Sequence, residues 1–505
     1  MSQEYDVVVV GSGNAALCAA LSAREQGARV LVLERAPEPE RGGNSAFTAG
    51  AMRVAFDGVD DILALVPDLA AEQVDRTDFG TYTQAQFIDD MARVTEFRAD
   101  PDLVEVLVKL SFPTLAWMRD KGVRFAPIYG RQAFSDNGRF TFWGGLVLEV
   151  VGGGPGLVDY LTRAAVREGI DIWYGTRAVS LLTEDGRVTG VHYRHDSRQA
   201  TVHAGAVVLA SGGFQANAEW RARYLGVNWD LAKVRGTRFN TGDGIRMALE
   251  INAMPWGHWT GCHAVGWELN SPAFGDPAIG DSFQKHSYPF GIMINARGER
   301  FVDEGADFRN YTYAKYGREI LRQPGQFAWQ IFDSKVRHLL RDEYRIKQVT
   351  RVTADTIEGL ARKLDGVDAD RLLTTIAEFN AAADPSRPFN PNLMDGRGTS
   401  GLAVPKSNWA NTIDEPPFEA YATTCGITFT FGGLRISREA EVIDCEGEVI
   451  PGLYACGELV GGIFYFNYPG GSGLTSGAVF GKIAGANAAV ATAGITPRLR
   501  TAGAP

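Results

Sequence analysis

The sequence predicts an α/β protein in which a Rossmann-like dinucleotide-binding domain is interrupted by an inserted α+β domain. Residues 5–35 have the order strand, glycine-rich turn, helix and strand, which begins such a domain. Residues 255–412 then become richer in aromatic and charged side chains, and strands and glycine-rich turns return after them. We therefore predict one domain from residues 1–254 and 413–505, and a second domain from residues 255–412.

The first elements follow from local patterns. Residues 5–10 form a nearly continuous apolar run, which is typical of a parallel strand buried on both faces. The alanine-rich residues 14–27 predict a helix that ends at Gly27, and residues 29–34 predict the second strand. The remaining predictions are helices over 100–122, 156–169, 241–253 and 476–491, helices within 353–383, and strands over 172–174, 178–183, 188–194 and 206–210.

Composition excludes several function classes. A formal net charge of -10 argues against a nucleic-acid-binding protein, whose binding face is rich in Lys and Arg. The five cysteines form no C-x-x-C pair and the seven histidines have no metal-ligand spacing, so we predict no metal. No run of 18 apolar residues predicts a membrane span, and the first residues lack a basic targeting segment. We expect a cytoplasmic protein.

The first chemical motif is a glycine-rich turn between the first strand and helix. Gly11 permits the tight turn, Gly13 lets a pyrophosphate approach the backbone, and Ala16 lets helix and strand pack closely. Glu34 ends the second strand, where its carboxylate can accept from the hydroxyls of a ribose. The predicted dinucleotide-binding residues of this motif are Gly11, Gly13, Asn14, Ala15, Ala16, Glu34 and Arg35.

Two further blocks are dense in small residues. The block from 41 to 50 suits backbone pressed against a flat ring, although a surface loop would have the same composition. Near the C-terminus a predicted strand ends in Gly457-Glu458, and a glycine-rich turn from 469 leads into a helix whose start can stabilise negative charge. The candidate binding residues of these blocks are Gly42, Gly43, Asn44, Ser45, Gly50, Gly457, Glu458, Gly473 and Leu474.

With these three blocks in this order, the chain resembles the fumarate reductase/succinate dehydrogenase flavoprotein family over about residues 4 to 490. It is most similar to tricarballylate dehydrogenase-like proteins, in residues 13–21, 235–240 and 426–430. The resemblance implies a glutathione reductase-type FAD domain, a capping domain over the substrate, and hydride transfer between the flavin and a substrate carbon. It further implies FAD contacts from Ala178, Ser211, Gly212, Gly213 and Asp243.

The chain departs from this family at three places. Asn44 stands where succinate dehydrogenases carry the histidine that bonds covalently to FAD, so the resemblance implies non-covalent FAD. Residues 428–433 read Thr-Phe-Thr-Phe-Gly-Gly, without the histidine that binds a substrate carboxylate in fumarate reductases. Tyr468 stands in place of a substrate arginine and resembles the tyrosine that polarises a ketone in 3-ketosteroid dehydrogenases.

The candidate catalytic residues are Arg309, Tyr468 and Tyr311. An arginine suits a bidentate grip on a carboxylate, and in this family an arginine near this point donates a proton. For Arg309 a domain-interface role remains open, and for Tyr311 simple packing. Arg235 and Arg238 suit either an anion grip or a structural ion pair, and His286 suits a structural histidine. Tyr129, Arg131, Phe142 and Trp143 lie in the stretch that lines the substrate site in this family.

These observations lead to three functional hypotheses. The first is an FAD-dependent dehydrogenase or reductase that acts on a CH–CH bond next to a carboxylate, with a tricarballylate-like polycarboxylate as substrate. The second is the same chemistry on a cyclic ketone. The third is a flavin protein that carries electrons for a partner. A nicotinamide-linked enzyme without flavin is the remaining alternative. Since the chain has no iron–sulfur or haem motif, we expect a separate electron acceptor, namely oxygen, a quinone or a redox protein.

Overall fold

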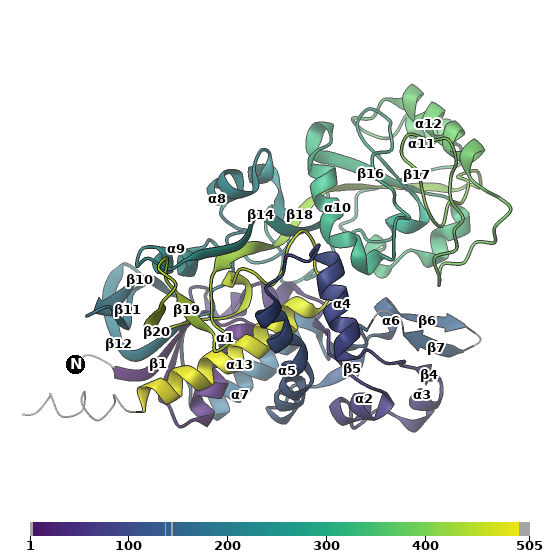
Figure 1. The fold of residues 1–505 in the computed structure, drawn as a ribbon. Helices are drawn as coiled ribbons and strands as arrows, with labels where there is room; N and C mark the ends of the chain where they lie inside the picture. The colour runs from purple at the N-terminus through teal and green to yellow at the C-terminus, as the bar shows by residue number, and fades with distance from the viewer. Residues whose placement is uncertain (1–3, 137, 143–144, 494–505) are drawn as a thin grey trace, which may run out of the picture. The chain divides into compact units, whose positions relative to one another are not determined.

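The computed structural model describes residues 4–136, 138–142 and 145–493, and it confirms the mixed α/β fold class (Figure 1). The chain divides into two compact units. Unit 1 consists of Met1–Leu225, Gly236–Cys262 and Phe429–Pro505, and unit 2 of Gly226–Arg235 and His263–Thr428.

Unit 1 is built on a large sheet whose centre is parallel. The strand order is β10-β11-β12-β1-β2-β9, with β20 beside β12 and β19 beside β20. Strand β1 pairs in parallel with both β12 and β2, and β20 extends the parallel part along the end of β12. The bounds are β1 Glu4–Val10, β2 Val30–Leu33, β9 Asp171–Trp173, β10 Thr176–Glu184, β11 Arg187–His195, β12 Arg198–Leu209, β19 Glu441–Ile443 and β20 Val449–Ala455.

Burial explains why these residues form the centre of the sheet. Val7, Val8 and Val9 of β1 are 0% exposed, so side chains on both faces of the strand are covered, as in other parallel sheets. Each such side chain contributes about 1.5–3 kcal/mol of hydrophobic free energy. Helix α1 (Asn14–Glu25) and helix α13 (Ser472–Thr492) pack against each other and against the sheet (Figure 1). The backbone of α1 therefore approaches α13 closely, and a Cβ at Gly485 would lie 2.0 Å from the carbonyl oxygen of Ala19.

Two small three-stranded sheets complete unit 1. One has the order β3-β8-β5 and the other β4-β7-β6. Their bounds are β3 Ala51–Met52, β4 Thr77–Asp78, β5 Phe125–Pro127, β6 Ala133–Asp136, β7 Arg139–Phe142 and β8 Leu148–Val150. The other helices of this unit are α2 Val59–Leu65, α3 Ala71–Asp75, α4 Gln84–Val94, α5 Pro101–Asp120, α6 Tyr129–Gln132, α7 Gly153–Arg167, α8 Ala218–Trp220 and α9 Asp243–Leu249.

Unit 2 contains a second sheet with helices beside it. Its order is β13-β18-β16-β15, and β14 and β17 also pair with β18. Its core includes Ile292, Trp329, Ile376 and Phe379, all at most 3% exposed. The bounds are β13 Lys233–Val234, β14 Pro255–Glu268, β15 Ile292–Ile294, β16 Phe327–Phe332, β17 Arg351–Ala354, β18 Phe418–Leu434, α10 Tyr313–Leu321, α11 Ile357–Ala361 and α12 Ala369–Ala382.

The units do not divide where the sequence placed the domain boundaries. Residues 255–262 belong to unit 1, and residues 226–235 and 413–428 belong to unit 2. The reason is that β14 and β18 are single long strands that each pass from one unit into the other. A change in composition marks the ends of such a strand, and a boundary within the strand leaves no compositional signal.

The local predictions agree well with these elements. The helix predicted over 100–122 is α5, the one over 156–169 is α7, and the hairpin at Asp185-Gly186 joins β10 and β11 with positive φ at both residues. The last helix begins at Ser472, four residues before the predicted start at 476. No helix of the described residues is long and apolar enough to cross a membrane. The same residues contain no cluster of His, Cys, Asp and Glu that could hold a metal ion.

Candidate cofactor and active site

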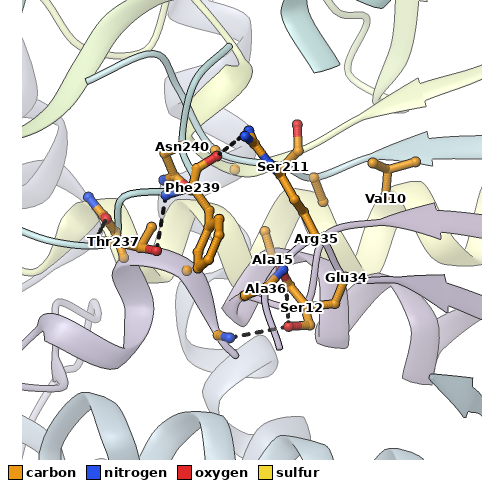
Figure 2. Close-up of a pocket in the computed structure, with 18 of the residues that line it drawn as sticks. Val10, Ser12, Ala15, Glu34, Arg35, Ala36, Ser211, Thr237, Phe239 and Asn240 are labelled. Carbon is orange, nitrogen blue, oxygen red and sulfur yellow. Dashed lines mark hydrogen bonds between the residues drawn. The ribbon is translucent and has the colours of Figure 1, made fainter. Parts of the chain in front are cut away.

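A pocket lies at the carboxyl ends of β1 and β2 in unit 1, where the first glycine-rich turn joins β1 to α1 (Figure 2). We call it the glycine-lined pocket. Its lining residues are Val10, Gly11, Ser12, Gly13, Asn14, Ala15, Leu33, Glu34, Arg35, Ala36, Gly42, Gly43, Asn44, Ser45, Thr176, Arg177, Ala178, Ala210, Ser211, Gly212, Thr237, Phe239, Asn240, Asp243, Gly457 and Glu458.

The turn requires glycine at Gly11 and leaves little space for a side chain at Gly13. Gly11 has φ +109°, and a Cβ there would lie 2.5 Å from the carbonyl oxygen of Ala210. At Gly13 a Cβ would lie 3.3 Å from Ser45 Oγ, so the second block of small residues closes directly over the turn. Ser45 Oγ accepts a hydrogen bond from the Asn14 N–H at the start of α1, at 3.0 Å. The turn thus places the amino end of α1 at the pocket, where its dipole favours an anion.

The acidic side of the pocket is built around Glu34. Its carboxylate accepts from Ser12 Oγ at 2.5 Å and from the Ala36 N–H at 2.7 Å, and Figure 2 shows Ser12 and Glu34 side by side. Ser12 Oγ in turn accepts from the Gly42 N–H at 3.2 Å. Burial raises the pKa of Glu34, while the hydrogen bond from Ser12 acts in the opposite direction. The carboxylate lies where the sequence predicts contact with a ribose.

Two arginines share one carboxylate at another side of the glycine-lined pocket. Arg177 holds Asp243 with two hydrogen bonds of 2.8 and 2.7 Å, and Arg35 contacts the same carboxylate at 3.1 Å. Arg35 also donates to Thr241 Oγ1 at 2.5 Å and lies 5.8 Å from the Phe239 ring centroid. This cluster joins three chain segments, namely the end of β2, the start of β10 and the start of α9.

A buried glutamate joins another three segments. Glu458 lies in the 3₁₀ turn Gly457–Leu459 that follows β20. Its carboxylate accepts from the Thr430 N–H at 3.0 Å, Gln215 Nε2 at 3.2 Å and Asn240 Nδ2 at 3.4 Å. Burial raises the pKa of this carboxyl group to about 7, against the lowering effect of those hydrogen bonds. A Cβ at Gly213 would lie 2.4 Å from Glu458 Oε1, so the glycine makes room for the carboxylate.

The structure brings most of the predicted cofactor residues to one pocket. Ala16, Gly50, Gly213, Gly473 and Leu474 do not line it. Ala16 is fully buried between helix and sheet. Gly50 lies against Gly153 at the start of α7, and a Cβ at Gly50 would lie 2.9 Å from the Gly153 Cα. Leu474 offers its carbonyl oxygen to Asn14 Nδ2 at 2.8 Å. The cofactor contacts of these five residues stay predictions.

Sequence reasoning missed several lining residues, which are Val10, Ser12, Leu33, Ala36, Thr176, Arg177, Ala210, Thr237, Phe239 and Asn240. Most of them flank a residue that was predicted. Thr237, Phe239 and Asn240 belong to the block 235–240, which carried part of the family resemblance without being assigned to the site. The Thr237 N–H donates to Asn44 Oδ1 at 2.9 Å, which ties this block to the second glycine-rich block.

Tyr468 lies in unit 1 within a group of aromatic rings. Its ring meets Phe429 edge-on at a centroid distance of 5.2 Å and Phe464 at 5.7 Å. Phe429 also contacts Phe431 at 5.3 Å. We call Phe429, Phe431, Phe464 and Tyr468 the aromatic wall. A Cβ at Gly473 would lie 3.8 Å from both Phe429 and Tyr468, so the first turn of α13 adjoins this wall.

The other two catalytic candidates lie in unit 2. Arg309 and Tyr311 are the first and last residues of a 3₁₀ turn, Arg309–Tyr311. Arg309 donates to Asn310 Oδ1 at 3.0 Å and to the buried His286 Nδ1 at 3.4 Å. Burial and the neighbouring Arg309 charge lower the pKa of His286 well below its usual value, so this imidazole is neutral. The catalytic roles of Arg309, Tyr311 and Tyr468 stay predictions.

The remaining candidates are placed as follows. Arg235 forms a buried ion pair with Asp281, with Nε 2.7 Å from Oδ1, and Arg238 pairs with Glu40 at 2.8 Å. Both arginines therefore fit the ion-pair alternative. Tyr129 contacts Phe142 at 5.5 Å, and Trp143 lies outside the described residues.

Comparison with known proteins identifies the family. The model of the FAD binding domain family matches residues 6–474. The chain belongs to this family. It is 30% identical to fumarate reductase (cytochrome) of Shewanella frigidimarina, over 96% of the chain and 77% of that protein. It is 27% identical to 3-oxosteroid 1-dehydrogenase of Mycolicibacterium smegmatis, over 97% of the chain and 98% of that protein. The solved open conformation of a flavocytochrome c3 fumarate reductase superposes with a TM-score of 0.70 at 27% identity, covering 97% of this chain and 79% of that one.

These findings make the protein an FAD-dependent oxidoreductase of the fumarate reductase/3-ketosteroid dehydrogenase type, and the glycine-lined pocket fits FAD. The glycines of its turn keep side chains away from the backbone, as close approach of a pyrophosphate requires. Ser211 Oγ lines the pocket and is buried, and no atom of the described residues satisfies it. A buried hydroxyl without a partner is costly, and a polar ligand would supply the missing hydrogen bond.

Proposed function

We propose that this oxidoreductase acts on a carbon–carbon bond next to the carbonyl group of an apolar, ring-shaped substrate. The observation that carries the proposal is the aromatic wall beside the start of α13. Phe431, Phe464 and Tyr468 are at most 9% exposed and Phe429 is half-buried. Apolar rings of this kind would stabilise an apolar ring beside them by burial and edge-to-face contact. A polycarboxylate would lose part of its hydration against the same rings.

The glycine-lined pocket is proposed to hold FAD without a covalent bond. The start of α1 takes the pyrophosphate, Glu34 accepts from a ribose hydroxyl, and Ser211 donates to the cofactor. Asn44 has an amide where a covalent link would need a ring nitrogen. Bound FAD supplies the acceptance or donation of hydride at its N5.

The residues of unit 1 are proposed to polarise the substrate. The Tyr468 hydroxyl donates to the substrate carbonyl, while the ring contacts with Phe429 and Phe464 fix the orientation of the phenol. Negative charge that develops on the carbonyl oxygen is stabilised by a donor that is already in place. Arg309 and Tyr311 remain the proposed proton carriers. The electrons are exchanged with a separate partner, which we take to be a quinone, oxygen or a redox protein.

A polycarboxylate such as tricarballylate is the second candidate. The similarity to fumarate reductases supports it, and so does the guanidinium group of Arg309, which suits a bidentate grip on a carboxylate. Arg235 weakens this candidate, because its charge is paired with Asp281 inside the protein. The chain therefore has fewer cations available for three carboxylates than its sequence suggests.

The two candidates are distinguished by ligand titration of the oxidised holoprotein. A 3-ketosteroid, a small cyclic enone, tricarballylate and succinate are added in turn, and the flavin absorption spectrum is followed. The proposal expects saturable spectral changes with the ketones and weak or no change with the acids. Saturation by tricarballylate at lower concentration than by any ketone would reverse the order of the two candidates.

A further inference from the structure

Arg53 is a buried cation that no part of the proposed chemistry uses. It follows β3 in unit 1, and its side chain is 0% exposed. Burying a guanidinium is costly unless it is paired and hydrogen-bonded. Its Nη1 lies 3.5 Å from Asp90 Oδ2, and its Cζ lies 5.0 Å from the Tyr82 ring centroid. Tyr82 donates its hydroxyl to the same Asp90 oxygen at 2.7 Å.

The opposite side of Arg53 is attached to the turn that precedes α13. Its Nε donates to the Gly470 carbonyl at 2.9 Å, and its backbone N–H donates to the Gly471 carbonyl at 3.2 Å. Its own carbonyl accepts from Thr475 Oγ1 at 2.8 Å. Three hydrogen bonds therefore join this one residue to residues 470–475.

These bonds fix the direction of a peptide group that glycine leaves free. In a trans peptide the C=O and the following N–H point to opposite sides. Since the Gly470 carbonyl points at Arg53, the Gly471 N–H points away from it. Gly471 has φ +84°, and a Cβ there would lie 2.6 Å from Leu146 Cδ1. A Gly-Gly turn does not select one peptide orientation by itself, so the selection must come from its neighbours.

We propose that Arg53 is a positioning residue that holds the Gly470–Gly471 peptide so that the Gly471 N–H lies on the side away from Arg53 and can stabilise negative charge that develops during the reaction. This inference rests on the proposed function in one respect, namely that the reaction takes place beside the aromatic wall. The first turn of α13 adjoins that wall at Phe429 and Tyr468. With the peptide held, the Gly471 N–H and the positive end of the α13 dipole would both favour negative charge on a reduced cofactor or substrate. A flipped peptide would present a carbonyl oxygen there.

The test measures the reduction potential of bound FAD in Arg53→Met, using dithionite and a reference dye with no substrate present. We expect the preference of the site for reduced over oxidised FAD to fall at least about tenfold, which lowers the potential by about 30 mV. The matched control is Arg93→Met. Arg93 pairs with the same Asp90, at 3.4 Å, but lies on the exposed side of α4, and its loss should leave the potential unchanged.

Two measurements separate positioning from a merely structural role. Arg53→Lys retains a donor for the Gly470 carbonyl and should recover part of the shift. Lower thermal stability of Arg53→Met with an unchanged potential would overturn the proposal. Because the titration needs no substrate, its result is independent of whether the enzyme prefers ketones or acids, so the two proposals fail separately.

Discussion

Replacing Tyr468 by phenylalanine removes one hydroxyl group and keeps the aromatic wall. The ring of Tyr468 contacts Phe429 and Phe464 edge-on at 5.2 and 5.7 Å, and phenylalanine preserves both contacts. The free energy of unfolding should therefore fall by no more than one hydrogen bond contributes, about 0.5–1.5 kcal/mol. Tyr468 does not line the glycine-lined pocket, so the affinity for FAD should also stay unchanged.

The expected loss is confined to the chemical step. A positioned donor to a developing oxyanion contributes about 10² to 10³ in rate, or roughly 2.7–4 kcal/mol. The assay is anaerobic stopped-flow mixing of the oxidised holoprotein with a saturating 3-ketosteroid, and the rate of flavin bleaching is recorded. We expect Tyr468→Phe to bleach at least about a hundredfold more slowly than the wild-type protein.

A second substitution separates the hydroxyl from the ring. Tyr468→Leu removes both, and large-to-small changes at a buried aromatic position cost about 3–5 kcal/mol when the side chain is cut to alanine. This variant should lose stability as well as rate. If Tyr468→Phe bleaches as fast as the wild type, the hydroxyl polarises nothing and the role given to Tyr468 is wrong.

Three further predictions concern the pocket. Gly11→Ala places a Cβ 2.5 Å from the Ala210 oxygen at a φ of +109°. Fluorescence titration of the apoprotein should then show FAD affinity at least about tenfold weaker. Unchanged affinity would mean that the turn does not hold the cofactor. Asp243→Asn removes the counter-ion that Arg35 and Arg177 share. Thermal unfolding should show a loss of about 1–3 kcal/mol in the free energy of unfolding. An unchanged free energy of unfolding would show that solvent screens the cluster. Burial raises the Glu458 pKa from 4.5 to about 7, so the native state binds the proton more tightly than the unfolded chain. The stability of the apoprotein should therefore fall by at most about 3 kcal/mol as pH rises from about 4.5 to about 7. Urea unfolding at pH 5 and 8 measures this change, and Glu458→Gln should make stability less dependent on pH.

The parts of the site that sequence predicts are those fixed by local backbone rules. Gly11 and Gly13 stand between a buried strand and a helix, where a Cβ would clash at Gly11 and make a tight contact at Gly13, and Glu34 follows the adjacent strand. Thr237 and Asn240 could not be assigned in this way, because they reach the pocket from a segment with no glycine-rich signature of its own.

Arg53 shows a second limit of sequence reasoning. Its role depends on carbonyls 417 residues further along the chain, and a single arginine after a short strand carries no pattern. The early start of α13 has a related cause. Gly471, Gly473 and Gly477 lower the helix propensity of this segment, yet contacts with Arg53 and Asn14 hold the first turn in place.

The most direct test of the central claim is the absorption spectrum of the purified protein before and after anaerobic mixing with a 3-ketosteroid. The account predicts a yellow protein with about one FAD per chain, released by denaturation because it is not covalently bound, and bleaching by the ketone but not by succinate. A colourless protein that takes up no added FAD would contradict the assignment of the glycine-lined pocket. A yellow protein that is bleached by tricarballylate and by no ketone would contradict the role of the aromatic wall.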